Sequence, residues 1–351
     1  MFQSPQEKFE ISGGKDMMKG MKRRLRLGAV AVLLCLLLST QVFAAETLVP
    51  MGCTVGLQLE AGGVIVAGFS EVNTAEGTAT PAADAGLKIG DVITQVGGRS
   101  TATAAEFLSA LAALDGGQVE LTARRNNTDL LLRVTPAQSS EGNWQLGLWL
   151  RDGISGIGTV TFYDKDSGSF GALGHGINDT DSGKLLPFTQ GSVTDAAVVE
   201  VVKGGPGAPG ELCGQPEQDH VLGALEKNTD SGVFGTADLS ELCCQEPVPV
   251  AGEDEVHLGP ASILTTVSDG GVEEYSIEIS RIYRQRTDQR FLLLTVTDPR
   301  LIERTGGIVQ GMSGSPILQD GKLVGAVTHV LLSDATRGYG ISIQDMLAAA
   351  A

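Results

Sequence analysis

The sequence predicts a mainly β protein, and both its composition and its patterning lead to that class. Glycine occurs 47 times among the 351 residues, whereas Phe, Trp and Tyr together make up 5%. Abundant glycine favours tight turns, and a chain of many turns is built from short strands rather than long helices. Apolar segments separated by glycine turns, such as Gly153–Phe162, continue this pattern through the second half of the chain. We therefore expect a β-rich architecture.

The length and charge of the chain limit its organisation and its partners. A chain of 351 residues has room for two domains of ordinary size, each with its own core. Its 25 Lys and Arg residues against 42 Asp and Glu residues give a net charge of −17. Because an acidic surface repels phosphate backbones, we do not expect nucleic acid as a partner.

Residues 1–46 are predicted to be a cytoplasmic leader and an export signal rather than part of the fold. The basic stretch Lys22–Arg26 precedes an unbroken apolar run at Leu27–Leu38, and small residues follow. This order of charge, apolar run and small residues is that of a secretory signal. Residues 27–45 are also just long enough to remain in the membrane as an uncleaved anchor. Under both alternatives the basic flank stays in the cytoplasm and the chain after Glu46 is exported.

Residues 48–136 are predicted to form one small module of strands and a helix. Strands are expected at Val55–Leu59, Gly63–Ala67, Val119–Ala123 and Asp129–Val134, and a helix at Thr103–Leu114. The run P-A-x-x-A-G-L-x-x-G-D-x-I at residues 81–93 resembles the bacterial PDZ domain. The order of the elements agrees with that resemblance.

The resemblance to PDZ domains implies a peptide-binding groove. In such domains a glycine between two apolar residues forms a loop that binds a peptide's terminal carboxylate through backbone N–H groups. Here Val55, Gly56 and Leu57 occupy that place. The peptide then adds as a strand to the sheet edge. Peptide C-termini or internal protein segments are the expected partners, and a vestigial groove that only packs on its neighbour is the alternative.

Residues 144–351 are predicted to form the second domain, after a polar linker at Pro136–Asn143. The central feature of this domain is the stretch Gly311–Pro316, in which Ser313 stands among glycines and a proline ends the turn. A serine in such a turn can project as a nucleophile, and the backbone N–H groups of Gly311 and Ser313 can form an oxyanion hole. The pattern G-x-S-G-x-P is that of the nucleophile loop of chymotrypsin-like serine peptidases. It implies a chymotrypsin-like β-barrel domain.

Local patterns around this loop predict a β scaffold. The turn Gln319–Lys322 separates two apolar runs and predicts a hairpin. The alternating segments Glu274–Tyr283 and Arg290–Val296 predict a second hairpin. Asp298 stands before a helical turn and is well placed as its N-cap.

Four histidines are candidates for the base that a serine nucleophile needs. His220 and His257 lie in acidic, polar segments and are expected on the surface. His175 lies between two glycines at the end of a strand, N-terminal to the serine as in the chymotrypsin-type order. We predict His175 as the base. His329, which closes the strand after the nucleophile hairpin, is the alternative.

The residue pattern does not decide which carboxylate orients the histidine. Asp298 lies shortly before the serine at the end of a strand, but its role as a helix cap competes for the same oxygens. Asp179 and Asp195 are the other candidates.

Several segments resemble the SpoIVB peptidases of endospore-forming bacteria, namely Gly171–Asp179, Thr297–Asp298, Thr305–Pro316, Gly325–Val330 and Gly338–Ile341. The resemblance runs from the membrane segment through the PDZ module to the end of the chain. It implies a serine peptidase with Ser313 as nucleophile, His175 as base and Asp298 as acid.

The same resemblance implies a role in sporulation. Such an enzyme is exported from the forespore into the space between the two membranes. There it cleaves a membrane-associated regulator and so permits processing of a late sigma-factor precursor. Members of the family also cleave themselves near the N-terminus, and residues 46–54 are expected to be a loose segment that accommodates this cleavage.

No cofactor and no metal are expected. Cys213 can pair with Cys243 or Cys244, because disulfides are permitted outside the cytoplasm. The cysteines show no C-x-x-C spacing, so their pattern does not predict a zinc site.

Two other functions are alternatives to a regulatory peptidase. One is a PDZ-bearing binding or scaffold protein with an inactive peptidase fold, and the intact Ser313, His175 and neighbouring glycines argue against it. The other is a housekeeping protease that degrades misfolded proteins. Such enzymes carry PDZ modules after the peptidase domain, whereas here the module is expected before it.

Overall fold

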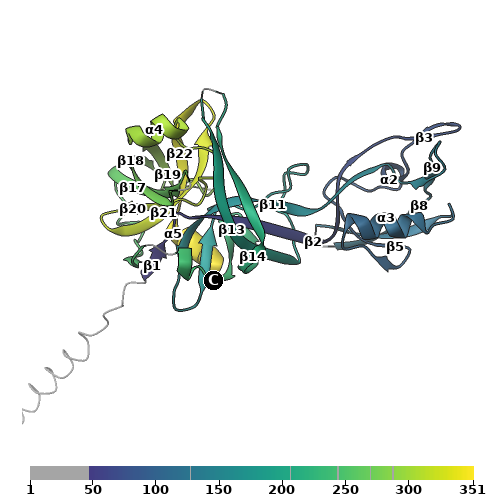
Figure 1. Ribbon diagram of the computed structural model, residues 1–351, viewed down its shortest axis with the longest axis horizontal. Helices are drawn as coiled ribbons and strands as arrows, with labels where there is room; N and C mark the ends of the chain where they lie inside the picture. Colours follow the sequence, from purple (N-terminus) through teal and green to yellow (C-terminus); the bar gives the residue numbers. More distant parts are fainter. Residues whose placement is uncertain (1–46, 127, 206, 243–244, 269, 287) are drawn as a thin grey trace, which may run out of the picture. The chain divides into compact units, whose positions relative to one another are not determined.

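Figure 1 shows the computed structural model of the chain, which describes residues 47–126, 128–205, 207–242, 245–268, 270–286 and 288–351. The leader and anchor predicted for residues 1–46 lie outside the described residues, as do the predicted disulfide partners Cys243 and Cys244. Within the described ranges, no helix is long and apolar enough to cross a membrane. The fold is mainly β, as predicted.

Six strands close into a barrel, here called the C-terminal barrel. In their order around it they are β17 (Gly259–Thr266), β18 (Val272–Ile282), β19 (Leu292–Val296), β22 (Asp334–Ser342), β21 (Lys322–Leu331) and β20 (Pro316–Gln319). Both predicted hairpins are confirmed, since β18 pairs with β19 and β20 pairs with β21. The β20–β21 turn consists of Asp320 and Gly321, whose φ values of 52° and 75° are those a type I′ turn needs.

A second set of six strands pairs into a closed ring, here called the N-terminal ring. In their order around it they are β2 (Thr54–Phe69), β11 (Leu148–Tyr163), β12 (Ser169–Ala172), β15 (Gly232–Ala237), β14 (Glu211–Thr229) and β13 (Gln190–Val202). The short strands β1 (Thr47–Pro50) and β16 (Val248–Pro249) extend the same sheet. The ring and the barrel each enclose an apolar core.

The PDZ-like part is inserted into the ring rather than placed before it. Residues 55–60 of β2 pair with β13, whereas residues 64–65 of the same strand pair with β5 (Val92–Val96). The chain returns along β11, which pairs antiparallel with β2 for almost its whole length (Figure 1). We call residues 62–152, which lie between the ring parts of β2 and β11, the inserted module. The predicted borders 48–136 and 144–351 do not coincide with the ends of this insertion, because the first ring strand precedes the module and the second follows it.

The inserted module has its own core and the predicted internal elements. Besides β5 these are β3 (Val72–Thr74), β4 (Gly77–Ala79), α2 (Pro81–Asp84), β6 (Arg99–Ser100), α3 (Ala104–Ala112), β7 (Val119–Arg125), β8 (Thr128–Val134), β9 (Ala137–Gln138) and β10 (Trp144–Gln145). Helix α3 begins where predicted, because the Thr103 hydroxyl accepts a hydrogen bond from the Glu106 N–H at 3.2 Å. The predicted linker forms a small hairpin, since β9 pairs with β10.

The structure contradicts the predicted carboxylate loop at Val55, Gly56 and Leu57. These residues lie in the middle of β2, with Gly56 opposite Ile157 of β11 on one edge and Thr194 of β13 on the other. A strand paired on both edges has no backbone N–H groups left for a ligand. A Cβ on Gly56 would lie 2.3 Å from the Thr194 hydroxyl, so glycine is needed here for the packing of the ring.

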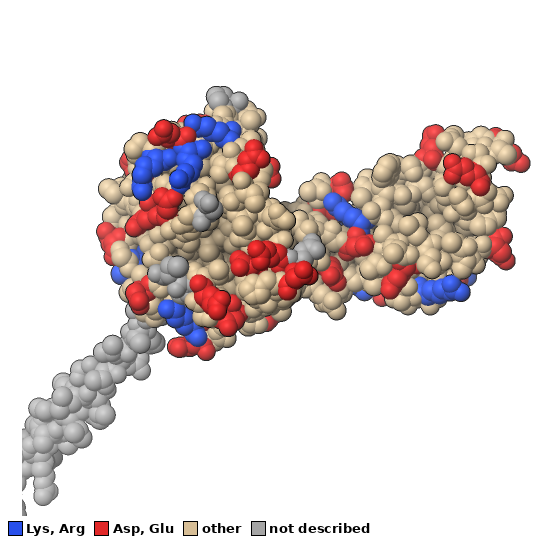
Figure 2. Space-filling model, in the orientation of Figure 1, with Lys and Arg blue, Asp and Glu red and all other residues tan. Residues whose placement is uncertain are grey.

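Three helical segments complete the described chain: η1 (Ser240–Leu242), α4 (Pro299–Thr305) and α5 (Ile343–Ala350). Acidic side chains are spread over the face shown in Figure 2, whereas basic side chains gather over α4. There Arg300 and Arg304 pair with Glu273 of β18.

Candidate active site

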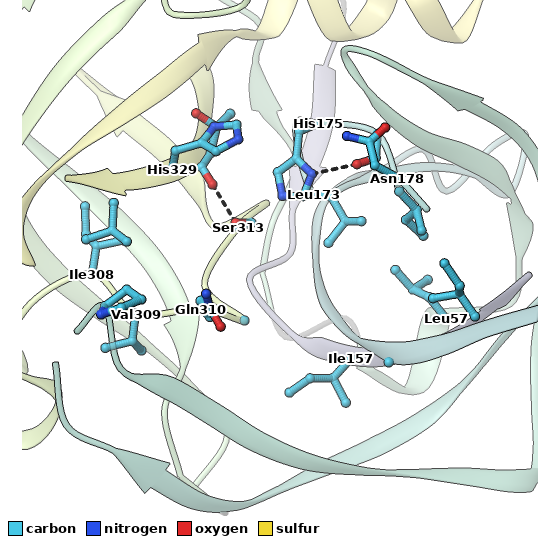
Figure 3. A pocket seen from close by; sticks show the side chains of 18 of the residues that line it. Leu57, Ile157, Leu173, His175, Asn178, Ile308, Val309, Gln310, Ser313 and His329 are labelled. Atoms are coloured by element: carbon cyan, nitrogen blue, oxygen red, sulfur yellow. Dashed lines mark hydrogen bonds between the residues drawn. The ribbon is translucent and has the colours of Figure 1, made fainter. Parts of the chain in front are cut away.

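A cleft of about 710 Å³ lies where the N-terminal ring meets the C-terminal barrel (Figure 3). The ring contributes Leu57, Ile154, Gly156, Ile157, Leu173, His175, Gly176, Ile177, Asn178 and Pro209, and the barrel contributes Ile308–Gly311, Ser313, Thr328–Val330 and Leu332. Among these described lining residues there is no Asp, Glu, Lys or Arg. The structure therefore brings the predicted nucleophile and both candidate bases into one uncharged cleft.

Ser313 lies on the loop that joins α4 to β20. The Met312 N–H donates to the Val309 carbonyl at 3.2 Å, and the Gly314 N–H donates to the Val327 carbonyl at 2.7 Å. A Cβ on Gly314 would lie 2.1 Å from the Thr159 carbonyl oxygen, so only glycine lets the loop approach the ring this closely. The Ser313 hydroxyl donates to the Thr328 carbonyl at 2.5 Å.

The nucleophile loop is fastened to strand β11 of the ring. The Thr159 hydroxyl donates to the Gly311 carbonyl at 2.7 Å, and the Thr161 hydroxyl donates to the Gly314 carbonyl at 2.8 Å. These carbonyls flank Ser313 on either side. The N–H groups of Gly311 and Ser313 donate to no other described residue. Both N–H groups are therefore available to a ligand.

His175 is placed by an unusual turn at the end of β12. Leu173 and Gly174 have φ values of 69° and 67°, and a positive φ is uncommon for leucine. The turn is held by the Leu173 N–H, which donates to the Thr159 carbonyl at 3.1 Å. The His175 ring then faces the cleft, with its Nδ1 2.9 Å from the Gly176 carbonyl oxygen.

The two cleft histidines are neighbours, and the pKa of each is lowered. Their ring centres lie 5.1 Å apart. Burial lowers the pKa of His175 below its ordinary 6.5, and the hydrogen bond to Gly176 only partly offsets this effect. Burial also lowers the pKa of His329, and a charge on His175 lowers it further. A neutral imidazole can accept a proton, as a base must.

Asn228 is a residue of the site that the sequence reasoning missed. Its side-chain carbonyl accepts from the Ile177 N–H at 2.8 Å. Its amide group donates to the carbonyls of Ile177 at 2.8 Å and Leu186 at 3.1 Å. One side chain on β14 thus holds both sides of the loop that follows His175. Its position between Lys227 and Thr229 on a strand gave no local signal for this role.

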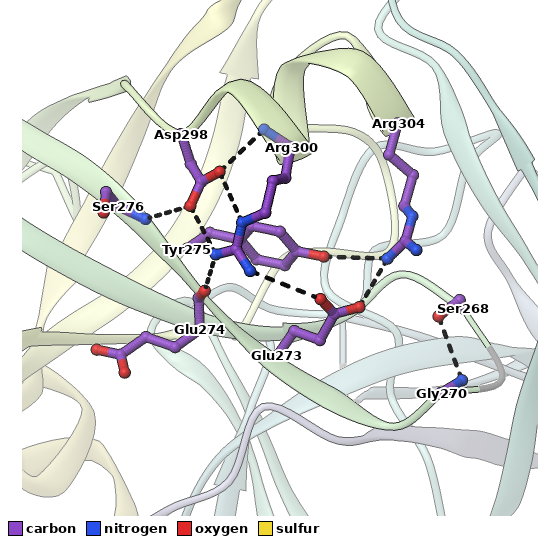
Figure 4. A network of polar contacts seen from close by, with 9 residues as sticks. All are labelled: Ser268, Gly270, Glu273, Glu274, Tyr275, Ser276, Asp298, Arg300 and Arg304. Carbon is purple, nitrogen blue, oxygen red and sulfur yellow. Dashed lines mark hydrogen bonds and ion pairs between the residues drawn. The ribbon is translucent and has the colours of Figure 1, made fainter.

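Asp298 is not among the residues that line the cleft. It lies instead in a network of polar contacts with Ser276 and Arg300 (Figure 4). Its carboxylate accepts from the backbone N–H groups of Arg300 and Ser276, at 2.9 Å and 3.2 Å, and pairs with the Arg300 guanidinium at 2.8 Å. The hydrogen bond from Arg300 is the main reason that the pKa of Asp298 falls to about 2. These are the contacts of the N-cap of α4, the competing role named above. They contradict the assignment of Asp298 as the acid that orients His175.

The other two candidate acids also lie away from the cleft lining. Asp179 is buried and pairs with Arg151, and the Ser182 N–H donates to it at 2.7 Å. Asp195 lies on β13 and is 3.7 Å from a ring nitrogen of His220. With Glu217, these two residues form the group in the described chain whose ligand atoms lie close enough to hold a metal ion.

A second pocket, of about 680 Å³, lies in the inserted module between α3 and the start of β11. It is lined by Phe107, Leu108 and Leu111 of α3 and by the segment Leu146–Leu148, among others. In that segment Gly147 has a φ of 69° between two leucines. A glycine between two apolar residues is the pattern predicted for the carboxylate loop at Gly56. The outer edge of Leu148–Arg151 pairs with no described strand, so a peptide could add there.

Two family models match the chain. The model described as SpoIVB peptidase S55 matches residues 142–347, more than half of the 351 residues. The chain belongs to the SpoIVB peptidase S55 family. It is a serine endopeptidase, as predicted. A model of the PDZ domain matches residues 74–125, which lie within the inserted module of this S55 peptidase.

Solved structures resemble parts of this S55 peptidase at low identity. The PDZ domain of an SdrC-like protein from Listeria monocytogenes is 22% identical, with a TM-score of 0.21, and the match covers 25% of this chain and 87% of that one. The Rv3671c protease of M. tuberculosis in its active form is 15% identical, with a TM-score of 0.31, over 56% of this chain and 74% of that one. An HtrA-type protease, AlgW with tripeptide, is 13% identical, with a TM-score of 0.33, over 55% and 54%. No curated protein matches the sequence.

Proposed function

We propose that this S55 peptidase is an exported regulatory endopeptidase in which Ser313 attacks the peptide bond and His175 is the general base. The observation that carries the proposal is that the nucleophile loop of the barrel and the histidine turn of the ring line the same cleft. Each residue is held by the backbone turn that its sequence requires, at Gly314 and at Leu173–Gly174 respectively.

The hydrogen bonds of His175 define its part in the reaction. The Gly176 carbonyl can only accept, so the proton of the neutral ring is on Nδ1 and Nε2 carries the lone pair. Once the Ser313 hydroxyl turns from the Thr328 carbonyl to the histidine, Nε2 takes its proton as the oxygen attacks the substrate carbonyl. His175 then gives that proton to the leaving amine. In this proposal the Gly176 carbonyl orients the ring, as a carboxylate does in other serine peptidases.

The oxyanion that forms in this step needs hydrogen-bond donors. The unpaired N–H groups of Gly311 and Ser313 fit that role, because they belong to one tight turn beside the nucleophile. Since the turn is fastened through Thr159 and Thr161, the donors are held in place before the substrate arrives.

The lining of the cleft indicates the class of substrate. Ile308, Val309 and Val330 lie on the barrel side and Leu57 and Ile157 on the ring side, and no lining residue carries a full charge at neutral pH. An apolar wall gives nothing to pair with a Lys, Arg or acidic side chain. We therefore propose cleavage within apolar, uncharged peptide segments.

The regulatory role that we propose is the one implied by the SpoIVB peptidase family. We propose that the substrate is a membrane-associated regulator of sporulation, cut in the space between the forespore membranes, so that a late sigma-factor precursor is processed. Self-cleavage is also part of the proposal, but its site must lie before Thr47. Within the predicted loose segment at 46–54, residues 48–54 are buried, and Thr47–Pro50 form strand β1, which pairs with β11 and β16.

The inserted module is proposed to bind peptides in the groove between α3 and β11. The loop Leu146–Leu148 then takes the place predicted for Val55–Leu57 and binds the terminal carboxylate. The apolar side chains Leu108 and Leu111 face the last residues of the peptide.

An active-site phosphonylating reagent tests the proposed chemistry. The full chain is labelled and digested, and the modified peptide is identified by mass spectrometry. We expect one adduct on Ser313, formed only when His175 is intact. A folded protein that gives no adduct, or an adduct on another serine, contradicts the assignment and favours the scaffold alternative.

A further inference from the structure

Arg151 lies on β11 where this strand passes from the inserted module into the N-terminal ring. Its backbone pairs with Ile65 of β2, and the register of the β2–β11 pairing shifts between Arg151 and Gly153. The three residues before it, Leu148–Leu150, form the strand edge of the peptide groove. The residue after it, Asp152, accepts a hydrogen bond from the Ala104 N–H at the start of α3. Arg151 thus stands at the end of the groove.

The side chain of Arg151 reaches the loop that follows His175. Its guanidinium donates to Asp179, lies 2.6 Å from an oxygen of Asp181, and donates to the Thr180 hydroxyl at 3.1 Å. The Asp179 side chain is only 3% exposed, so water screens this ion pair weakly. Asp179 follows His175 closely along the same loop.

The other polar contacts between this loop and the described part of the module are weaker. Ser182 lies against Gly90, and the Lys184 ammonium donates to the Asn126 side chain at 3.0 Å, but both contacts are at the surface. On the ring side, Asn228 holds Ile177. Arg151 is therefore the one cationic contact to a buried carboxylate, among the described residues, between the groove strand and the histidine loop.

We propose that Arg151 is a positioning residue that couples peptide binding in the groove to the catalytic histidine. The proposal rests on the peptidase function and the groove assigned above. A peptide that pairs with Leu148–Arg151 orders the end of this strand. The ordered strand holds the guanidinium on Asp179, and that contact holds the loop on which His175 stands.

The coupling requires two states of the loop that the peptide distinguishes. In one state Arg151 is engaged with Asp179, and in the other the loop is released and His175 is less well aligned with Ser313. The Arg151 Nε is buried and donates to no described residue, so one hydrogen-bond donor of this side chain is unsatisfied in the engaged arrangement. A ligand that favours the engaged state shifts the equilibrium towards it by the ratio of its affinities for the two states, and this ratio is the upper limit of the rise in turnover.

Steady-state kinetics of the full chain and of Arg151→Gln test the proposal. Active sites are counted with the phosphonylating reagent, and turnover is measured on a fluorogenic apolar peptide. We expect Arg151→Gln to lower kcat per active site by about 5- to 150-fold, the range of typical coupling energies, with KM nearly unchanged. Arg133→Gln, which removes the exposed pair with Glu120, is the matched control and keeps parental kinetics.

The second arm adds octapeptides that end in Leu with a free carboxylate, and their C-terminal amides as controls. We expect the free acids to bind the parent and raise its kcat. Arg151→Gln should bind them more weakly by fluorescence anisotropy, because it loses the engaged state that the peptide favours, and should show no rise in kcat. Arg151→Lys keeps the charge but not the planar fork, and should keep part of the response.

The outcomes separate the proposals. If Arg151→Gln loses only thermal stability and keeps the parental kcat and the peptide response, the arginine is merely structural and the coupling is wrong. If the parent binds no octapeptide, the groove assignment fails and the coupling with it. If the parent takes no phosphonyl label, the peptidase assignment itself fails.

Discussion

Ser313 and Ser315 are two serines of one loop, and their surroundings distinguish them. Ser313 lines the cleft, whereas Ser315 is completely buried and its hydroxyl has no partner among the described residues. A buried hydroxyl cannot reach a peptide substrate. At the scale of single residues, burial therefore decides between two nucleophiles that the motif alone leaves close together.

The first prediction compares these serines. Ser313→Ala should abolish cleavage in a folded protein, with a loss on the order of 10⁴-fold or more in kcat. His175→Ala should lose about as much, and the double variant hardly more, because the two act as one unit. Ser315→Ala should keep parental turnover, since it removes only an unsatisfied hydroxyl. Turnover of a fluorogenic peptide checks all four proteins, and an active Ser313→Ala would move the nucleophile.

The second prediction concerns pH. Protonated His175 cannot accept the serine proton, so kcat/KM should fall as the pH drops through the pKa of this residue. Because burial lowers that pKa, the midpoint of the acid limb should lie below 6.5. The exposed His257 pairs with Asp320, so His257→Asn is the control and should leave the limb in place. A midpoint at or above 6.5 in the parent would contradict the assigned environment.

The lowered pKa of His175 also makes the free energy of unfolding depend on pH. The unfolded chain binds a proton on His175 at its ordinary pKa of 6.5, whereas the folded chain binds it only at lower pH. The contribution of the neutral buried ring is therefore complete above pH 6.5. It is lost as the pH falls from 6.5 towards the folded-state pKa.

The third prediction separates the two roles of Asp298. As the N-cap of α4, it should tolerate Asn, which caps as well as Asp, but not Ala, which costs about 1 kcal/mol in the free energy of unfolding. Asp298→Asn should then keep most of the parental kcat per active site. If Asp298 were instead the acid that orients His175, Asp298→Asn should lower kcat by about 10⁴-fold, because the amide favours the wrong tautomer of the histidine. Denaturant unfolding and active-site-titrated turnover decide between the roles.

At the scale of elements, local signals in the sequence were sufficient wherever the element is local. Helix α3, the β18–β19 hairpin and the two-residue turn after Gln319 follow from spacing, capping and turn residues that are close in sequence. Strand β2 was instead predicted as two short strands. Nothing in its own residues shows that one half pairs with β13 and the other with β5.

The misplaced carboxylate loop has the same cause. Val55–Leu57 and Leu146–Leu148 both present a glycine between apolar residues. What separates them is strand pairing with distant partners: the first is closed in on both edges and the second borders a pocket. The prediction of Asp298 as the acid failed for the same reason. Asp298 and Ser313 are near in sequence, but Asp298 contacts Ser276 of β18 whereas Ser313 lines the cleft.

The fourth prediction tests the two glycine loops. Gly56→Trp should prevent folding rather than block a groove, because a Cβ there would already lie 2.3 Å from Thr194 and 2.7 Å from Pro216. Leu108→Glu should leave the fold intact, since Leu108 is 60% exposed, but weaken binding of an octapeptide ending in Leu. Leu131→Glu, equally exposed on β8 and outside the pocket, is the matched control. Peptide binding that survives Leu108→Glu would contradict the assigned groove.

At the scale of the whole molecule, the insertion makes the peptide module and the catalytic ring inseparable in sequence. A chain cut at the predicted border between residues 136 and 144 would lose β2 and leave the ring open between β11 and β13. The order of two separate domains was the argument against the housekeeping alternative, and that argument no longer applies. Strand β11 instead runs from the groove to the carbonyls on either side of Ser313.

The last prediction concerns activation of the whole chain. In digestive enzymes of the chymotrypsin type, a newly cleaved N-terminal amine pairs with an aspartate just before the serine and organises the oxyanion loop. Here that position is Met312, which is fully buried in the core of the C-terminal barrel. The loop is also held from outside, since the Leu212 N–H donates to the Gln310 carbonyl at 2.8 Å and the Gln310 N–H donates to Gly210 at 3.1 Å. Packing and backbone hydrogen bonds thus take the place of the ion pair.

We therefore expect that no defined N-terminal amine is needed for turnover. Extra residues placed ahead of Glu46, with trimming blocked, should leave kcat on a peptide substrate near the parental value, because β1 pairs with β11 and β16 rather than with the nucleophile loop. Met312→Leu, which keeps the apolar packing, should also stay active, whereas Met312→Asp should lose stability because it buries an unpaired charge. An enzyme that remains silent until its N-terminus is trimmed to one exact residue would show that an amine completes the site after all. Self-cleavage before Thr47 would then be an activation step rather than a release from the membrane.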